Sequence, residues 1–183
     1  MNGEPAAVFT IPTIATERLT LRAITPGDLD AYAAMWADPE FMRHLGGPAA
    51  RAVAWRNMAT ALGHWALWGY GQWSVVETAT GELVGRAGLW NEPGWPGVEV
   101  TWFIGRPHWG RGFAMETGRA TLRFAFEHLT VDQLVFVIDA GNTPSIRVAE
   151  KIGATYLRTE YLHGKDQEVY VITRAEWETR TGG

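Results

Sequence analysis

The length, composition and charge of the chain exclude several classes of protein. Its 183 residues suffice for one domain with a sizeable core, and the absence of cysteine excludes disulfides, thiolate metal ligands and cysteine nucleophiles. Lys and Arg number 16 against 20 Asp and Glu, giving a net charge of −4, and the chain has no block of basic residues that would bind nucleic acid.

The chain begins with residues 1–15, which contain neither a basic region nor a long apolar run. We therefore expect a short flexible lead there rather than a signal peptide. No stretch approaches the roughly 20 apolar residues of a membrane span, so we predict a cytoplasmic protein with no membrane partner. Residues 16–183 contain no repeat, low-complexity tract or linker, which predicts one domain.

Hydrophobic periodicity divides this domain into strands and helices. The order of these elements predicts an α/β fold in which helices flank a mixed central sheet. A helix links the strands at 98–104 and 133–139, and we expect these two strands to run parallel. The predicted strands are 18–24, 72–78, 82–90, 98–104, 133–139, 154–162 and 167–173, and the predicted helices are 25–40, 49–67, 113–129 and 142–153.

Two glycines on either side of an arginine stand between the strand at 98–104 and the helix at 113–129. A Walker phosphate loop is excluded, because Arg111 and Gly112 occupy the places of its lysine and hydroxyl residue. The match to a dinucleotide-binding fingerprint is weak, because Met115 stands at the position of its third glycine. Two interpretations remain: an anion site formed by unpaired amides at the start of the helix, and an ordinary turn from strand to helix.

Aromatic residues and histidines leave further questions open. Ten tryptophans are many for this length, and five of them lie between residues 68 and 102. Large aromatic side chains fill cores, but they also form the walls of binding grooves, and the sequence allows both interpretations. The five histidines show no H-x-x-x-H spacing, so we predict no metal site.

Three segments together resemble the GNAT superfamily of acyl-CoA-dependent N-acyltransferases: residues 16–40, 97–127 and 139–156. They occur in the family's order, and the resemblance spans about residues 16–174. Within the superfamily, they look most like the ribosomal-protein N-terminal acetyltransferase branch. The resemblance implies a GNAT-like fold, acetyl-CoA as the cosubstrate and transfer of its acetyl group to a primary amine.

The family's cofactor signature falls on the run from Trp109 to Ala114. Gly112 and Ala114 occupy its two small-residue positions, whereas Trp109 stands where Gln or Arg is expected, as in many members of this branch. The resemblance implies that the amides of residues 110–114 hold the pyrophosphate, in space that larger side chains would fill. It also implies that the backbone of residues 102–104 pairs with the pantetheine arm and offers an amide to the thioester oxygen. The implied cofactor-binding residues are Trp102, Phe103, Ile104, Trp109, Gly110, Arg111, Gly112, Phe113, Ala114, Asn142 and Ser145.

Amide formation from a thioester needs a neutral amine and a proton for the departing thiolate. By resemblance, Glu99 receives the proton of the amine, directly or through water, and Ser145 protonates the thiolate. Taken alone, Glu99 could equally be a solvent-facing carboxylate, and Asn142 and Ser145 could simply cap a helix. We favour direct attack over a covalent intermediate, because the chain has no cysteine and its only serines, Ser74 and Ser145, lack a G-x-S-x-G setting.

The sequence thus predicts an N-acetyltransferase that uses acetyl-CoA. Its acceptor is expected to be a primary amine, either the N-terminal α-amine of a protein or the amine of a small molecule. The alternative is a CoA-binding fold without catalysis that serves as a sensor or interaction module. We expect a monomer or a homodimer.

Overall fold

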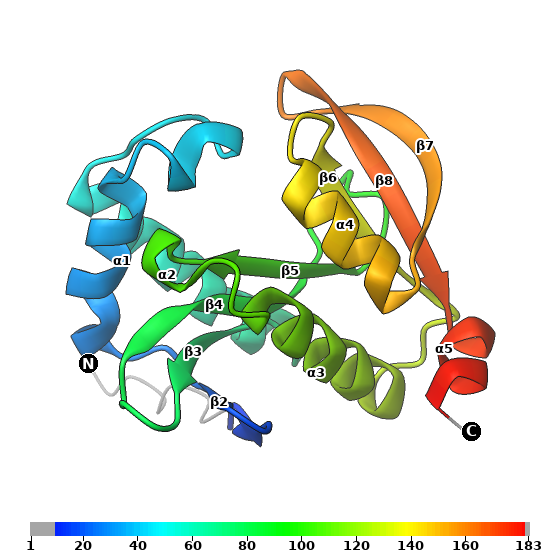
Figure 1. The fold of residues 1–183 in the computed structure, drawn as a ribbon, viewed down its shortest axis with the longest axis horizontal. Helices are drawn as coiled ribbons and strands as arrows, with labels where there is room; N and C mark the ends of the chain where they lie inside the picture. The colour runs from blue at the N-terminus through cyan, green and yellow to red at the C-terminus, as the bar shows by residue number, and fades with distance from the viewer. Residues whose placement is uncertain (1–9, 182–183) are drawn as a thin grey trace, which may run out of the picture.

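A mixed sheet of eight strands organises residues 10–181, the part of the chain that the computed structural model describes (Figure 1). The strands lie in the order β1-β2-β3-β4-β5-β6-β8-β7. Only β5 and β6 run parallel, and every other neighbouring pair is antiparallel. The strands are β1 (Ile14–Ala15), β2 (Leu19–Arg22), β3 (Gln72–Glu77), β4 (Leu83–Trp90), β5 (Glu99–Ile104), β6 (Gln133–Asp139), β7 (Thr155–Leu162) and β8 (Lys165–Thr173).

Helices connect many of these strands, and their ends have local causes. Gly69 follows α2 with a φ of 73°, a left-handed conformation that ends the helix. Asn142 caps α4 by accepting a hydrogen bond from the Ser145 amide. The α-helices are α1 (Leu29–Ala37), α2 (Arg51–Trp68), α3 (Phe113–His128), α4 (Thr143–Ile152) and α5 (Arg174–Thr181), and the 3-10 helices are η1 (Pro26–Asp28), η2 (Phe41–His44) and η3 (Arg106–His108). Within residues 10–181, no helix combines the length and apolar character needed to cross a membrane.

The side chains of β5 contact two separate hydrophobic clusters. Val100 and Ile104 belong to the cluster that includes the core residues of α3, whereas Phe103 packs against the cluster that α1 and α2 form. Successive side chains of a strand point to opposite faces of its sheet. At β5, therefore, α1 and α2 cover one face and α3 covers the other.

The sheet opens between β5 and β6. These strands pair at one position only, Glu99 with Val135, where the Val135 amide donates to the Val98 carbonyl at 3.0 Å. Beyond this point β6 remains paired with β8 along its whole length, and β5 remains paired with β4. The two halves of the sheet consequently separate toward the C-terminal ends of β5 and β6, which Figure 1 shows as a widening gap between the two ribbons.

The structure confirms the predicted α/β fold with its mixed sheet, and β5 and β6 are the expected parallel pair. The helix predicted at 25–40 is divided into η1 and α1, while β1 and α5 were not predicted. The lead predicted for residues 1–15 differs at its end, because Ile14–Ala15 form β1 and pair with β2. Its residues 1–9 lie outside the described part of the chain.

Two glycines provide a matched test of packing in this fold. A Cβ added to Gly85 of β4 would lie 2.3 Å from the Phe103 carbonyl oxygen of β5, whereas one added to Gly63 of α2 meets nothing within 4 Å. We expect Gly85→Ala to lower the free energy of unfolding by about 3 kcal/mol through overpacking. Gly63→Ala should raise it by about 0.5–1 kcal/mol, because alanine favours the helix. Urea unfolding of both variants checks the prediction, and equal effects would contradict the close approach of β4 to β5.

Candidate active site

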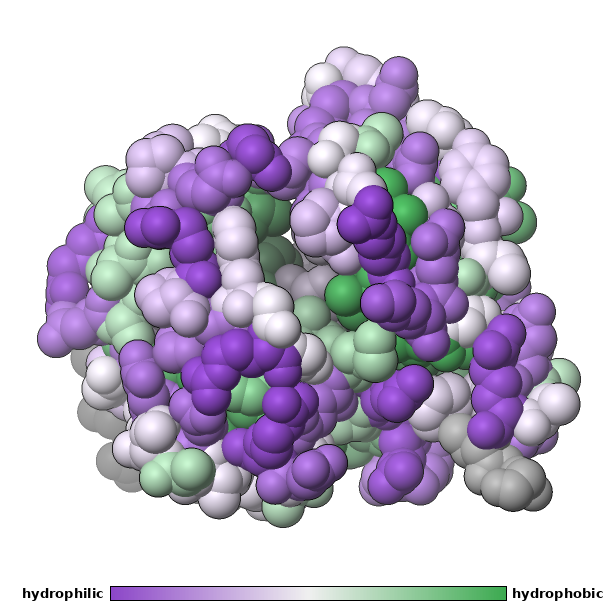
Figure 2. Space-filling view, in the orientation of Figure 1, coloured by the Kyte–Doolittle hydropathy of each residue, from purple (hydrophilic) through white to green (hydrophobic). Residues whose placement is uncertain are grey.

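A cleft of about 1210 Å³ lies at the opening between β5 and β6. Figure 2 shows the molecule hollowed there, between the side that carries α1 and the side that carries α4, with hydrophobic residues inside the hollow. Segments distant in sequence line it, including η2, β4, β5, the loop before α3 and the start of α4. All residues predicted as catalytic or cofactor-binding line this cleft except Arg111.

The loop before α3 offers a row of backbone donors to the cleft. The amides of residues 110–115 have no acceptor among residues 10–181, and the first amide of this region with a helical partner is that of Glu116, bonded to the Gly112 carbonyl. Gly110 and Gly112 have φ values of 74° and 83°, which side chains rarely adopt. The glycines are therefore required by the turn itself, and a Cβ on Gly112 would face Arg18 Nη2 at 3.3 Å. The free amides and the positive end of α3 together suit an anion.

The side chain of Arg111 points away from this row of amides. Its guanidinium forms an ion pair with Glu77 of β3 and stacks over the Phe113 ring at 4.5 Å from the centroid. Its carbonyl accepts a hydrogen bond from Arg18 Nη1 at 2.8 Å. Any contact of Arg111 with a ligand in the cleft would therefore use its amide.

The backbone of β5 has unused hydrogen-bonding groups along the opening. The Gly105 amide donates to the Val84 carbonyl of β4, whereas the Val98 carbonyl accepts from β6. Alternate residues of a strand direct their backbone groups to opposite neighbours. Trp102 and Ile104 thus direct their backbone groups toward the gap, where β6 no longer pairs with β5. One of these groups, the Ile104 carbonyl, accepts a hydrogen bond from the Trp109 indole at 2.6 Å.

Glu99 closes the narrow end of the opening. Its Oε1 accepts from the Val137 amide at 3.3 Å and its Oε2 accepts from the Trp95 indole at 2.9 Å. The residue is 8% exposed. Burial raises the pKa of Glu99 to about 8, against the lowering effect of these two hydrogen bonds. The burial of Glu99 and its two hydrogen bonds exclude its interpretation as a solvent-facing carboxylate.

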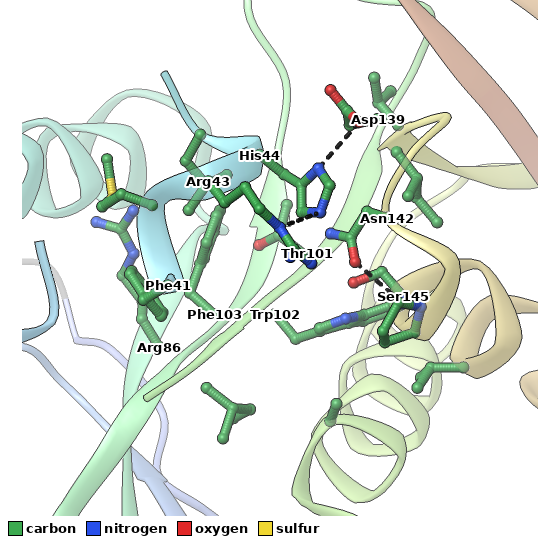
Figure 3. A pocket seen from close by; sticks show the side chains of 18 of the residues that line it. Phe41, Arg43, His44, Arg86, Thr101, Trp102, Phe103, Asp139, Asn142 and Ser145 are labelled. Atoms are coloured by element: carbon green, nitrogen blue, oxygen red, sulfur yellow. Dashed lines mark hydrogen bonds and ion pairs between the residues drawn. The ribbon is translucent and has the colours of Figure 1, made fainter. Parts of the chain in front are cut away.

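Asn142 and Ser145 face β5 from the start of α4 (Figure 3). The Ser145 amide donates to Asn142 Oδ1 at 3.3 Å, so the capping interaction is present. Both residues also line the cleft, and no hydrogen bond within residues 10–181 uses the Ser145 hydroxyl or the Asn142 amide nitrogen. Capping and ligand binding are thus compatible for this pair.

Sequence reasoning missed a cluster that joins the two sides of the cleft. His44 Nδ1 of η2 lies 3.0 Å from Asp139 Oδ1 of β6, and Lys165 Nζ lies 2.7 Å from Asp139 Oδ2 (Figure 3 shows the first contact). Lys165 also donates to the His44 carbonyl at 2.8 Å. The hydrogen bond from Lys165 lowers the pKa of Asp139 below its ordinary value. These residues are far apart in the chain and belong to no motif, so no local signal identifies them.

The tryptophans divide between the two roles that the sequence left open. Trp65 and Trp73 are buried in the core, at 3% and 0% exposure. Trp90, Trp95 and Trp102 line the cleft. The aromatic residues between 68 and 102 thus contribute to both the core and a groove.

Comparisons with known proteins agree on one family. A family model described as an acetyltransferase (GNAT) domain matches residues 18–155. The uncharacterized protein YkkB of Bacillus subtilis (strain 168) is 30% identical over 165 residues, which cover 86% of this chain and 93% of that protein. The uncharacterized N-acetyltransferase p20 of Bacillus licheniformis is 30% identical over 145 residues, covering 76% and 80%.

Solved structures share the fold. The acetyltransferase from Agrobacterium tumefaciens str. C58 has a TM-score of 0.82 and 34% identity, and the match covers 94% of this chain and 100% of that one. A Vibrio cholerae protein named as a putative ribosomal-protein-serine acetyltransferase has a TM-score of 0.77 and 21% identity, with coverage of 91% and 99%. At that identity the second likeness concerns the fold alone.

The buried carboxyl group of Glu99 predicts a pH-dependent stability. Its pKa in the folded protein, about 8, lies above the ordinary value of 4.5, so the folded state binds the extra proton between these pH values. The free energy of unfolding should therefore fall as pH rises from about 4.5 to 8, by at most about 1.4 kcal/mol per pH unit. Glu99→Gln should remove this dependence, and Glu178→Gln, on exposed α5, should retain it. Urea unfolding across this pH range provides the measurement, and parallel curves for the parent and Glu99→Gln would contradict the prediction.

Proposed function

The chain belongs to the acetyltransferase (GNAT) family, and from this premise we propose that it transfers the acetyl group of acetyl-CoA to a primary amine by direct attack. The acceptor is the N-terminal α-amine of a protein or the amine of a small molecule. The observation that carries the proposal is the continuity of the cleft. One cavity connects the free amides of the loop before α3, the unpaired backbone of β5 and the buried carboxyl group of Glu99.

The described residues fit the phosphate end of acetyl-CoA. Six consecutive amides, those of residues 110–115, have no acceptor among residues 10–181, and they lie at the positive end of a long helix. Gly110 lines the cleft, and a Cβ added there meets nothing within 4 Å. Backbone donors with open space in front of them suit the pyrophosphate.

The arm of acetyl-CoA would follow the opening between the strands. The backbone groups of Trp102 and Ile104 face that opening, and one of their amides would donate to the thioester oxygen. On the opposite side, Asn142 and Ser145 would contact the arm near its sulfur (Figure 3). Acetyl-CoA itself supplies the activated acetyl group.

Glu99 would accept the proton that the amine loses. A pKa of about 8 is close to that of an α-amine, so transfer of a proton between the two groups is nearly balanced. Above that pH the carboxylate would receive the proton directly or through water. Ser145 would donate a proton to the departing thiolate, and no covalent intermediate on the protein is needed, since the chain has no cysteine.

The phosphate site can be tested with two glycines in the same backbone conformation. Gly110 and Gly81 have φ values of 74° and 72°, and a Cβ on either meets nothing within 4 Å, but only Gly110 lines the cleft. Alanine at each position should cost about 1 kcal/mol of stability, because both turns are left-handed. Only Gly110→Ala should weaken acetyl-CoA binding, by about tenfold or more in Kd. Calorimetric titration measures this, and equal affinities for the two variants would remove the loop from the binding site.

The activity is tested by thiol release with acetyl-CoA and a panel of amines and peptides, followed by mass spectrometry of the products. We expect acetylated amine in amounts that match the released thiol. Glu99→Gln should keep the parent's affinity for acetyl-CoA but lose roughly 10²–10⁴-fold in kcat/KM above pH 8, where the Glu99 carboxylate of the parent can accept the proton, and less at neutral pH, where Glu99 of the parent is largely protonated. Parent-like rates in Glu99→Gln above pH 8 would exclude a proton-transfer role. Binding of CoA without turnover of any amine would support the alternative of a sensor.

A further inference from the structure

Arg86 is a buried cation without an ion pair. It lies in the middle of β4, opposite Phe103 of β5, and is 5% exposed. Its guanidinium carbon lies 5.0 Å from the ring centroids of both Trp36 and Phe103, and 6.0 Å from that of Tyr32. Three aromatic rings thus surround the charge, and no carboxylate among residues 10–181 forms an ion pair with it.

The guanidinium also leaves most of its donors unused. Its hydrogen bond to the described chain is a long one, from Nη1 to the Asn57 carbonyl at 3.4 Å. Nε is buried without a partner, and Nη2 has no acceptor within residues 10–181. Burial lowers the pKa of Arg86 to about 10, so the group remains charged at neutral pH. A buried charge with unused donors is costly unless a ligand satisfies it.

Asp28 is a nearby buried carboxylate, but it forms its ion pair with Arg22. Asp28 accepts two hydrogen bonds from Arg22, at 2.7 and 2.8 Å, and one from the Ser74 hydroxyl at 2.7 Å. Burial by itself raises the pKa of Asp28, but these hydrogen bonds outweigh that effect and leave the pKa lowered. Asp28 is therefore fully engaged, and residues 10–181 supply Arg86 with no counterion.

Arg86 lies on the side of the cleft opposite α4. It lines the cleft together with Trp36, Phe41 and Phe103, and Figure 3 shows it across the cleft from Asn142 and Ser145. In the register of β4 with β5, Arg86 pairs with Phe103 and Trp90 pairs with Glu99, so Arg86 and Glu99 project from the same face of the sheet. Along β5 the two positions are separated by about 13 Å at 3.3 Å per residue.

We infer that Arg86 binds a carboxylate of the acceptor, and that the acceptor is a small amine bearing that carboxylate, such as a dipeptide. This inference rests on the proposed acetyl transfer, because it places the amine of the acceptor near Glu99. A planar guanidinium with free donors matches a carboxylate in geometry as well as charge. The rings of Trp36, Phe41 and Phe103, which line the cleft with Arg86, suit an apolar side chain on the acceptor. Because α1, α2 and β5 enclose Arg86, the carboxylate must be carried by a molecule small enough to enter the cleft.

The first test compares matched acceptors that differ only in the carboxylate. Glycylphenylalanine and its C-terminal amide have similar α-amines, because the C-terminal group is remote from the amine, and glycylleucine and its C-terminal amide form a second pair. We expect the parent protein to acetylate the amine of the acid in each pair with a kcat/KM roughly 10–10² times higher than that for the amide. This ratio is the effect of one charged hydrogen-bonded contact. Arg86→Met should abolish this preference while leaving kcat/KM for the amides within a few fold. Arg51→Met removes an exposed arginine at the start of α2 and should keep the preference.

The second test needs no turnover. N-acetylphenylalanine has no free amine, and it should raise the Tm of the parent more than N-acetylphenylalaninamide does, because it binds the folded state through Arg86. Arg86→Met should lose this difference. It should also fold, because the substitution removes an unpaired buried charge and keeps an apolar side chain of similar length. If it does not fold, Arg86→Lys, which keeps the charge but not the planar pair of donors, should show a reduced difference in Tm.

The outcomes separate this inference from the proposed function. Equal rates for acids and amides, with equal shifts in Tm, would overturn the role of Arg86 and leave acetyl transfer in place. A carboxylate-dependent shift in Tm without acetylation of any amine would support the role of Arg86 and contradict the proposed function. Efficient acetylation only of long peptides, regardless of their C-terminal group, would show that Arg86 is a structural cation held by the aromatic rings.

Discussion

The separation of β5 from β6 is the constraint on which the rest of the site depends. After the single pairing of Glu99 with Val135, the Val137 amide donates to the Glu99 side chain at 3.3 Å. The carboxyl group thus occupies the place where the pairing of the two strands ends. Because β6 stays paired with β8 and β5 with β4, the opening between two well-paired halves is fixed. Backbone groups of β5 that would otherwise be satisfied within the sheet remain free for a ligand.

The face of the sheet beneath α1 and α2 carries two buried ionisable groups, Glu99 and Arg86, that form no ion pair within residues 10–181. Burial raises the pKa of Glu99 to about 8 and lowers that of Arg86 to about 10. Both pKa values lie above 7, so at neutral pH both groups hold a proton, which leaves Glu99 neutral and Arg86 charged. They do not neutralise one another because β5 holds them apart. The site thereby contains both a group able to exchange a proton and a positive charge that the fold leaves unmatched.

Contacts across the cleft attach η2 to the opposite half of the sheet. His44 and Lys165 both contact Asp139, so η2, β6 and β8 meet across the opening. These contacts are partly exposed and contribute modestly to stability. Their larger effect is positional, since they connect η2, which carries Phe41, to β6 and β8 across the cleft.

Local patterns in the sequence determined the order of the elements, the parallel pair in the sheet and the loop before α3, because periodicity and turn residues act over a few positions. The family motifs added Glu99, Asn142 and Ser145, and the structure brings these residues to one cleft. Only the tertiary structure decided which charges are paired: Arg111 with Glu77, Arg22 with Asp28, and Arg86 with no carboxylate in the described part of the chain. Ion pairs between residues distant in the chain cannot be predicted from the spacing of residues in the sequence. An ion pair depends on where the strands place two side chains and on how much water burial removes.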